Sequence, residues 1–244
     1  DKLHTLVSLF AIGERPSGSG DPYALRRAAL GIIRIILEDN LRIGLYDLVR
    51  LHSALVAGKL TDALQADETS RQLLEFFADR LKVALREKGT RHDLIDAVFS
   101  LGSEDDLVRL VARVEALQSF LKTDEGTNLL AGYKRAANIL KAEEKKDKKT
   151  FDGAPDAKLL SLPEEKALAE ALGSAETSIA ADVKAEKFVE AMGVMAKLRS
   201  PVDAFFDKVK VNDDDPKVRE NRLKLLARLR DTLHLVADFS KIEG

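Results

Sequence analysis

The chain has 244 residues, of which 45% are hydrophobic and 33% are charged, and its net charge is −2. This length is enough for one large domain or two smaller ones, each with its own hydrophobic core. Because the chain contains no cysteine, it can be neither a disulfide scaffold nor a thiolate metal site. With so little net charge, a surface for nucleic acid requires a local concentration of basic residues.

No segment has the features of a targeting sequence or a membrane span. The sequence contains no signal peptide and no apolar run of about 18 residues, which predicts a soluble, cytoplasmic protein. The first residue is Asp1 and not methionine. We therefore expect the chain to be a piece of a longer protein.

A loop rich in glycine, serine and proline, residues 13–20, leads into a basic helix. Such a loop can hold an anion with the unbonded N–H groups of the helix N-terminus. The alternative is a plain loop and cap, with Asp21 as the N-cap and Pro22 in the first helical position. The phosphate-binding and dinucleotide-binding glycine patterns are both absent, which favours the plain loop.

Almost every segment with a clear hydrophobic period has the period of a helix, as in residues 24–41, 71–89 and 105–121. No alternating strand pattern is present. Glycine, proline and acidic clusters separate these segments, which predicts an all-α chain of about eight to ten helices. The lysine-rich stretch 141–158 is polar enough to predict a mobile connection.

The helices are expected to form two helical domains, residues 1–122 and 126–244. The hinge is placed at residues 123–126, because their composition interrupts two strongly periodic helices. In this arrangement the second domain is a separate helix bundle.

The sequence offers little catalytic chemistry. No two histidines have the spacing that holds a metal on one helix face. The four lie far apart in the sequence, at His4, His52, His92 and His234. Asp93 stands at the start of a predicted helix, where we interpret it as a capping residue. No nucleophile-elbow pattern is present. We expect no catalytic residue, no metal and no bound cofactor in this chain.

Basic residues are concentrated in residues 128–150, where seven lysines and arginines face three acidic residues. On the predicted helix, an apolar stripe and a polar ridge follow different faces; the ridge comprises Lys134, Asn138, Lys141, Lys145 and Lys148. This local excess suits a phosphate backbone. A solvated lysine face gives the same pattern, and the residues alone do not decide between the two.

A second basic helix is predicted to begin at residue 216. Arg222 falls on its leucine stripe, so we expect a buried ion pair with Asp203 or Asp207 from the preceding segment. The other basic residues lie on other faces and could reach a ligand: Lys217, Arg219, Lys224, Arg228 and Arg230.

Two adjacent phenylalanines, Phe205 and Phe206, precede this helix. An exposed aromatic ring can stack on an unpaired base, and a buried one fills the core. Because adjacent residues seldom both face inward, we expect the core to take at least one of them and leave the other as a possible stacking surface.

Four motifs run through the chain in order: "DKLHTLVSLFAIGERPSGSGDPYALRRAALGIIRIILE", "FFADRLKVALREKGTRHDLIDAVF", "LLAGYKRAANILK" and "SPVDAFFDKVKVNDDDPKVRENRLKLLARLRD". They resemble the beta subunit of the bacterial two-chain glycyl-tRNA synthetases, from its HD-like domain to its end. The second half also resembles the all-helical anticodon-binding domain of arginyl-tRNA synthetases, through "YKRAANIL" and "NRLKLL".

The resemblance implies an alpha2beta2 enzyme that joins glycine to its tRNA using ATP. It places adenylate formation in the alpha subunit and tRNA recognition largely in the beta subunit, so the partners are glycine tRNA and the alpha subunit. It gives "GSGDPYALRR" a role in tRNA or subunit contact. Asp1 would match the last acid of an HD-type metal site. His4 stands where the family has an acid, which departs from a working phosphohydrolase centre.

Anticodon reading requires cations, an aromatic surface and amide or acid groups on one concave surface. The second domain supplies ten candidates: Lys134, Arg135, Asn138, Lys141, Phe205, Phe206, Asp207, Lys208, Arg219 and Arg222. Among them, Lys134 and Lys141 are expected to contact phosphates, whereas Arg135 and Asn138 are expected to read base edges. The competing hypothesis is a non-catalytic helical scaffold that mediates subunit association.

Overall fold

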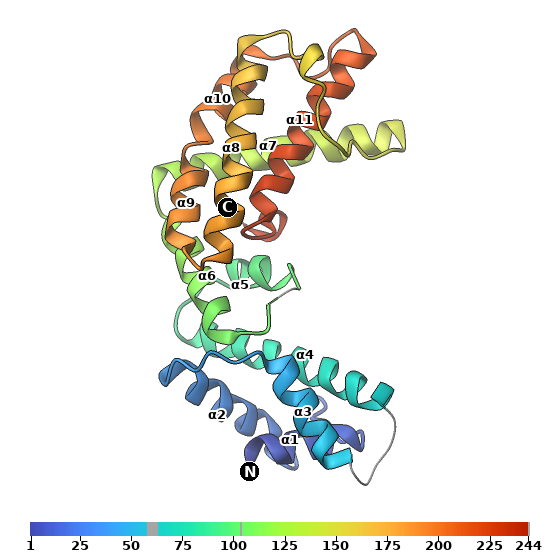
Figure 1. Cartoon of the computed structure of the whole chain (residues 1–244), viewed down its shortest axis with the longest axis vertical. Coiled ribbons are helices and arrows are strands. Elements are labelled where there is room, and N and C mark those ends of the chain that lie inside the picture. The colour runs from blue at the N-terminus through green and yellow to red at the C-terminus, as the bar shows by residue number, and fades with distance from the viewer. Residues whose placement is uncertain (58–62, 103, 244) are drawn as a thin grey trace. The chain divides into compact units, whose positions relative to one another are not determined.

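The computed structural model describes residues 1–57, 63–102 and 104–243. Over these residues the chain is all α-helical and contains isolated bridges but no strand, which confirms the predicted fold class. None of the described helices is both long and apolar enough to cross a bilayer. The chain forms two compact units (Figure 1), which we call unit 1 (Asp1–Ile95 and Gly102–Ala112) and unit 2 (Asp96–Leu101 and Arg113–Gly244).

Unit 1 is built mainly from four helices that pack on one another: α1 (Lys2–Ala11), α2 (Leu25–Glu38), α3 (Leu45–Ala57) and α4 (Ala63–Glu87). It also contains the first part of α5 (His92–Phe99) and of α6 (Leu107–Phe120). Apolar residues at helical spacing meet in its core, among them Leu6, Phe10, Ala29, Ile33, Leu73, Phe77 and Leu81.

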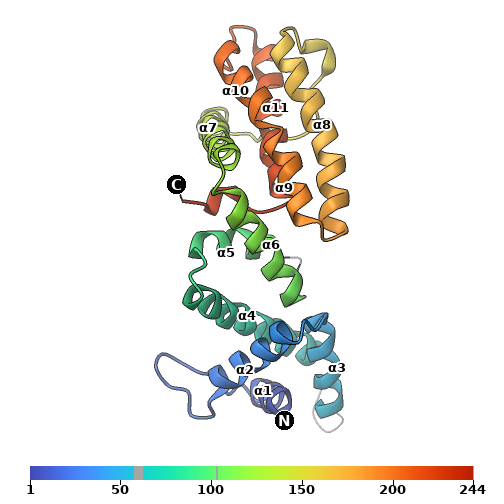
Figure 2. The same ribbon diagram turned by 90° about the vertical axis from the view of Figure 1, so that its left-hand side faces the viewer.

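Unit 2 is a bundle in which one long helix, α7 (Asp124–Asp147), lies across the others, and Figure 2 looks almost along its axis. The other helices are α8 (Pro163–Lys184), α9 (Phe188–Ala196), α10 (Arg199–Lys208) and α11 (Pro216–His234), with the 3-10 helices η1 (Ala157–Leu159) and η2 (Phe239–Lys241). Their buried faces form one core that includes Leu129, Tyr133, Leu140, Leu168, Leu172, Phe205, Leu226 and Phe239. Unit 2 is thus held together by apolar stripes that the sequence already displays.

The corner between α6 and α7 is tight. The hydroxyl of Thr123 caps α7 by accepting from the N–H of Gly126 at 3.0 Å, and it donates to the carbonyl of Phe120 at 2.7 Å. A Cβ atom at Gly126 would collide with that carbonyl. The compact units divide within α5 and α6, and the domain boundary at residues 123–126 stays a prediction.

The lysine-rich connection is anchored, so the expectation of a mobile segment is wrong. Helix α7 continues to Asp147, and Phe151 is buried with 1% of its surface exposed. The side chain of Asn221 accepts from the backbone N–H of Asp156 at 2.6 Å and donates to its carbonyl at 3.0 Å. One aromatic ring and one amide thus fix a segment whose composition is otherwise that of a linker.

Gly126→Ala should lower the free energy of unfolding by about 1–3 kcal/mol, because the added methyl group collides with backbone. Gly193 in α9 provides the matched control, since a Cβ atom there meets nothing within 4 Å. Gly193→Ala should therefore stabilise the chain by about 0.5–1 kcal/mol through helix propensity. Urea denaturation followed by circular dichroism measures both changes, and equal effects of the two substitutions would contradict this role of the corner.

Candidate nucleic-acid interface

The glycine-rich loop before α2 is held by hydrogen bonds to the start of that helix. The Asp21 carboxylate accepts from the N–H groups of Leu25 at 2.7 Å and Arg26 at 3.1 Å. The Arg26 guanidinium donates to the carbonyls of Gly18 at 2.7 Å and Gly20 at 3.3 Å. The prediction of Asp21 as the N-cap and Pro22 as the first helical residue is wrong, because α2 begins at Leu25 with Ala24 as its N-cap. The Asp21 carboxylate nevertheless binds the first two N–H groups of the helix. Because Asp21 occupies N–H groups that an anion needs, the loop serves as a cap.

The structure pairs two histidines that the sequence separates. Nδ1 of His4 lies 3.1 Å from Nε2 of His52. The pKa of His52 is lowered, mainly by burial and to a smaller extent by the charge of His4.

Asp93 lies in the first turn of α5, where its carboxylate accepts from the N–H of Leu94 at 3.0 Å and pairs with Arg91. Within the described ranges, no three histidine or acidic side chains group as metal ligands do.

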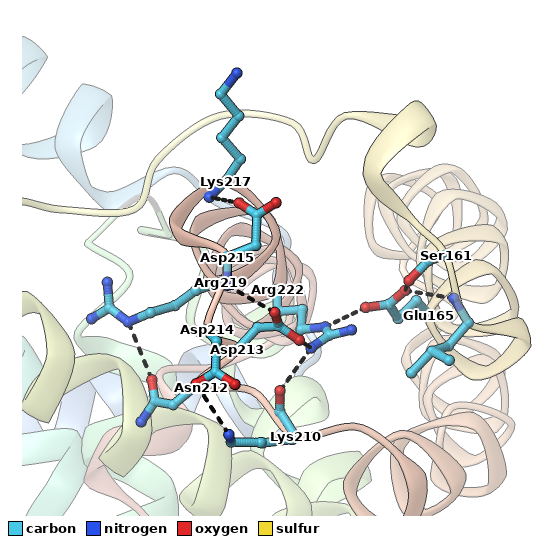
Figure 3. A network of polar contacts seen from close by, with 11 residues as sticks. Ser161, Glu165, Lys210, Asn212, Asp213, Asp214, Asp215, Lys217, Arg219 and Arg222 are labelled. Carbon is cyan, nitrogen blue, oxygen red and sulfur yellow. Dashed lines mark hydrogen bonds and ion pairs between the residues drawn. The ribbon is translucent and has the colours of Figure 1, made fainter.

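Arg222 is buried in unit 2, as its position on the leucine stripe predicts. Figure 3 shows it between Glu165 on one side and Asp213 and Lys210 on the other. Only 6% of its side chain is exposed, and its Nε donates to Glu165, whose side chain is fully buried. Its Nη1 donates to Asp213 at 2.5 Å and to the carbonyl of Lys210 at 2.8 Å. Arg222 thus joins α11 to α8 and to the connection between α10 and α11.

The predicted partners of Arg222, Asp203 and Asp207, are wrong. Both are exposed on α10, and Asp203 lies 3.6 Å from Arg199. The true partner, Glu165, is in the first turn of α8, where its carboxylate also accepts from the N–H of Leu162 at 2.8 Å. Glu165 thus already caps the start of α8, and its distance along the chain from Arg222 hides its second role.

Arg219 is held by acidic side chains of α7. Its Nη1 donates to Asp147 at 2.7 Å, its Nη2 donates to Glu143, and its Nε donates to Asn212 at 3.3 Å. Hydrogen bonds from Arg219 lower the pKa of Glu143 and of Asp147. With 16% of its side chain exposed, Arg219 is a structural link between α7 and α11.

Other basic side chains of α11 are also compensated. The pairs are Arg228 with Glu176 at 2.7 Å, Arg230 with Asp231 at 2.9 Å, and Lys224 with Glu220 at 3.3 Å. Lys217 is different, because its side chain extends away from the polar network in Figure 3. Most of the positive charge of α11 is therefore balanced within unit 2.

A group of cations on α7 remains without acidic partners. Lys141, Lys145 and Lys148 are exposed, and they make no ion pair with any part of the chain that the structure describes. Lys148 is the C-cap residue directly after α7, and we call these three lysines the α7 ridge. The residues of α7 that reach the core, such as Leu140, lie on another face of the helix. Lys134 is half-buried.

Arg135 lies over the ring of Phe206, with its Cζ 4.4 Å from the ring centroid. Phe205 is fully buried, whereas Phe206 is half-buried, and their rings meet edge to face with centroids 5.5 Å apart. The core takes Phe205, which agrees with the prediction that at least one of the two phenylalanines is buried. Three further candidates are exposed: Asn138, which follows Arg135 on α7, and Asp207 and Lys208, which follow Phe206 on α10.

Close approach of α7 and α10 brings Arg135 and Phe206 together. A Cβ atom at Gly132 would lie only 2.7 Å from Cγ1 of Val202. One turn further along each helix, Arg135 meets Phe206. Sequence reasoning selected both residues as candidates but missed their contact, which depends on this glycine.

Two parts of the chain match known protein families. Residues 1–100 match the family described as "Glycyl-tRNA synthetase beta subunit", and residues 129–243 match the "DALR anticodon binding domain". Over its whole length, the chain is 55% identical to the glycine–tRNA ligase beta subunit of Rhodospirillum centenum, 54% identical to that of Phenylobacterium zucineum and 48% identical to that of Ruegeria sp.. Residues 1–100 thus match the glycyl-tRNA synthetase beta-subunit family, and the whole chain is similar to glycine–tRNA ligase beta subunits. It spans about a third of these curated relatives, namely 34%, 33% and 34% of their lengths.

The match confirms the family resemblance that the sequence motifs carry. The region that matches the anticodon-binding domain begins at residue 129 and thus includes most of α7 and all of α8 to α11. The α7 ridge and the contact between Arg135 and Phe206 both lie inside it. The paired residues Arg219 and Arg222 lie inside it as well, in the networks that hold its helices together.

Arg222→Ala should lower the free energy of unfolding by roughly 3 kcal/mol, because it leaves the buried carboxylate of Glu165 without its partner. Arg199→Ala is the matched control, since it breaks a more exposed pair with Asp203 and should cost less than about 1 kcal/mol. Urea denaturation of the two variants compares them. Similar small losses would show that the buried pair is not a structural link.

Unit 2 should lose stability in acid. The pKa of Glu143 and that of Asp147 are lowered in the folded chain, so these carboxylates stabilise it above their unfolded pKa values, and the contribution disappears as the pH falls through the folded values. The urea concentration at the midpoint of unfolding should therefore decrease when the pH is lowered below about 4. Arg219→Gln should make this acid loss shallower, and an equally steep loss in the variant would exclude Arg219 as its source.

Proposed function

We propose that unit 2 binds glycine tRNA through its anticodon loop, as the recognition part of an ATP-dependent cytoplasmic synthetase. Its partner for glycylation is the alpha subunit, in an alpha2beta2 assembly. We assign no catalytic residue and no cofactor to this segment; ATP is used by the whole enzyme. The proposal is supported by the family match and, above all, by the division of the cations of unit 2 into two classes.

The first class of cations builds the fold. Arg219 and Arg222 lie in networks with carboxylates from α7, α8 and the α10–α11 connection, so their charge is already neutralised. A phosphate could recruit them only by breaking a buried ion pair, which typically costs several kcal/mol. We therefore remove both from the proposed tRNA surface and keep them as structural residues.

The second class is available to a polyanion. The α7 ridge presents three exposed ammonium groups, two on the last turns of the helix, at Lys141 and Lys145, and one at its C-cap, Lys148. Neutralising phosphates with such lysines releases counterions and requires no loss of internal ion pairs. The ridge thus accounts for RNA binding by a chain whose net charge is slightly negative.

Subunit association is the second candidate function, and an observation in unit 1 favours it there. Several large apolar side chains are exposed on that unit, with Ile12 and Leu51 both at 63% and Ile35 at 48%. Exposed apolar residues of this size suit protein contacts better than phosphate contacts. Under this alternative, the chain is a helical scaffold and its binding partner is protein.

Lys141→Ala and Lys145→Ala should each weaken binding of glycine tRNA to this chain and reduce the slope of log K against log salt by about one. Lys149→Ala is the matched control, because Lys149 is paired with Glu220 at 2.7 Å. Fluorescence anisotropy with labelled tRNA at several salt concentrations gives each slope. Slopes unchanged in both ridge variants would exclude the ridge as the phosphate contact.

A further inference from the structure

We infer that Arg135, Phe206 and Asn138 form a binding site for a single unstacked nucleotide base. The inference rests on the proposed function, since it assigns one part of the anticodon-binding domain to the faces and edges of bases and leaves phosphates to the α7 ridge. Three observations carry it: the unused hydrogen-bond donors of Arg135, the partial exposure of a rigidly held ring, and a neighbouring amide.

Arg135 differs from the other arginines of unit 2. Each of the others has a carboxylate or carbonyl partner, as shown by Arg113, Arg199, Arg219, Arg222, Arg228 and Arg230. Among the residues that the structure describes, Arg135 contacts the face of Phe206 and makes no ion pair. Its guanidinium is therefore held in place by an aromatic ring while its N–H groups stay available to a ligand.

Phe206 is a preorganised surface and not a loose side chain. Its ring packs edge to face on the fully buried Phe205, with an angle of 77° between the two planes. The contact between Gly132 and Val202 fixes the separation of α7 and α10 one turn away. RNA-binding proteins hold unstacked bases on aromatic rings and on guanidinium planes. The stacked arginine and phenylalanine offer both surfaces in one place.

Asn138 supplies the third element, a group that can read a base edge. It lies three residues after Arg135 on the exposed side of α7, so the two side chains are neighbours on the helix surface. Its amide is exposed and has no hydrogen-bond partner in the described parts of the chain. An amide both donates and accepts, which matches the mixed edges of bases. A lysine in the same place could only donate.

The test compares Phe206→Leu and Arg135→Lys in the 244-residue chain, with an anticodon stem-loop of glycine tRNA as the probe. Phe206→Leu removes the aromatic face, and Arg135→Lys keeps the charge but removes the planar guanidinium. Each should weaken binding about 5- to 150-fold, the range for losing one stacked base. The salt slope should stay unchanged, because no phosphate contact is lost.

Phe76→Leu is the matched control, since Phe76 in unit 1 is also half-buried and also has an arginine, Arg80, over its ring. It should leave binding unchanged. Asn138→Ala should reduce the preference for the glycine anticodon loop over a loop with one altered anticodon base. Urea midpoints close to that of the unaltered chain show that the variants are folded.

Three outcomes would overturn the inference. If Phe206→Leu and Arg135→Lys bind as tightly as the unaltered chain, no base stacks there, and the proposed function stands on the ridge alone. If Arg135→Ala weakens binding and lowers the salt slope while Arg135→Lys does neither, Arg135 is a phosphate contact. If the unaltered, folded chain does not bind the stem-loop, the proposed function and the inference both fail.

Discussion

The pairing of Arg222 with Glu165 is the interaction on which unit 2 depends most. A buried guanidinium requires a carboxylate within reach, because the cost of removing the charge from water is not otherwise repaid. Glu165 comes from the start of α8 and Asp213 from the connection before α11, so one side chain fixes the relative positions of three elements. Arg219 does the same for α7 by binding Glu143 and Asp147.

These ion pairs also decide which cations are left for a ligand. On α7, Glu143 and Asp147 face Arg219 of α11, whereas the ridge lysines of the same helix face solvent. The helix is thus basic on one side and acidic on another, and its net charge does not reveal this separation. An RNA surface built in this way needs no excess of positive charge over the whole protein.

The sequence predicts the helices well and the contacts between them poorly. Hydrophobic period places the helices, and it also predicts the burial of Arg222, because the residue falls on an apolar stripe. Its partner could not be found in this way, since Glu165 lies in another helix and reads as a capping residue. The contact of Arg135 with Phe206 depends on the absence of a side chain at Gly132, which has no periodic signal. The anchoring of the lysine-rich connection depends on Phe151, one aromatic residue in a polar segment.

The central claim is that cations paired inside unit 2 build it, while the unpaired lysines of the α7 ridge bind tRNA. Acetylation of lysines, followed residue by residue by mass spectrometry with and without glycine tRNA, tests this claim most directly. Slower acetylation of the α7 ridge and of Lys208 in the presence of tRNA is the predicted result. Rates should be unchanged at the exposed Lys184, the last residue of α8, and at the exposed Lys187, the N-cap of α9. Protection of Lys184 and Lys187 without protection of the ridge would contradict the account.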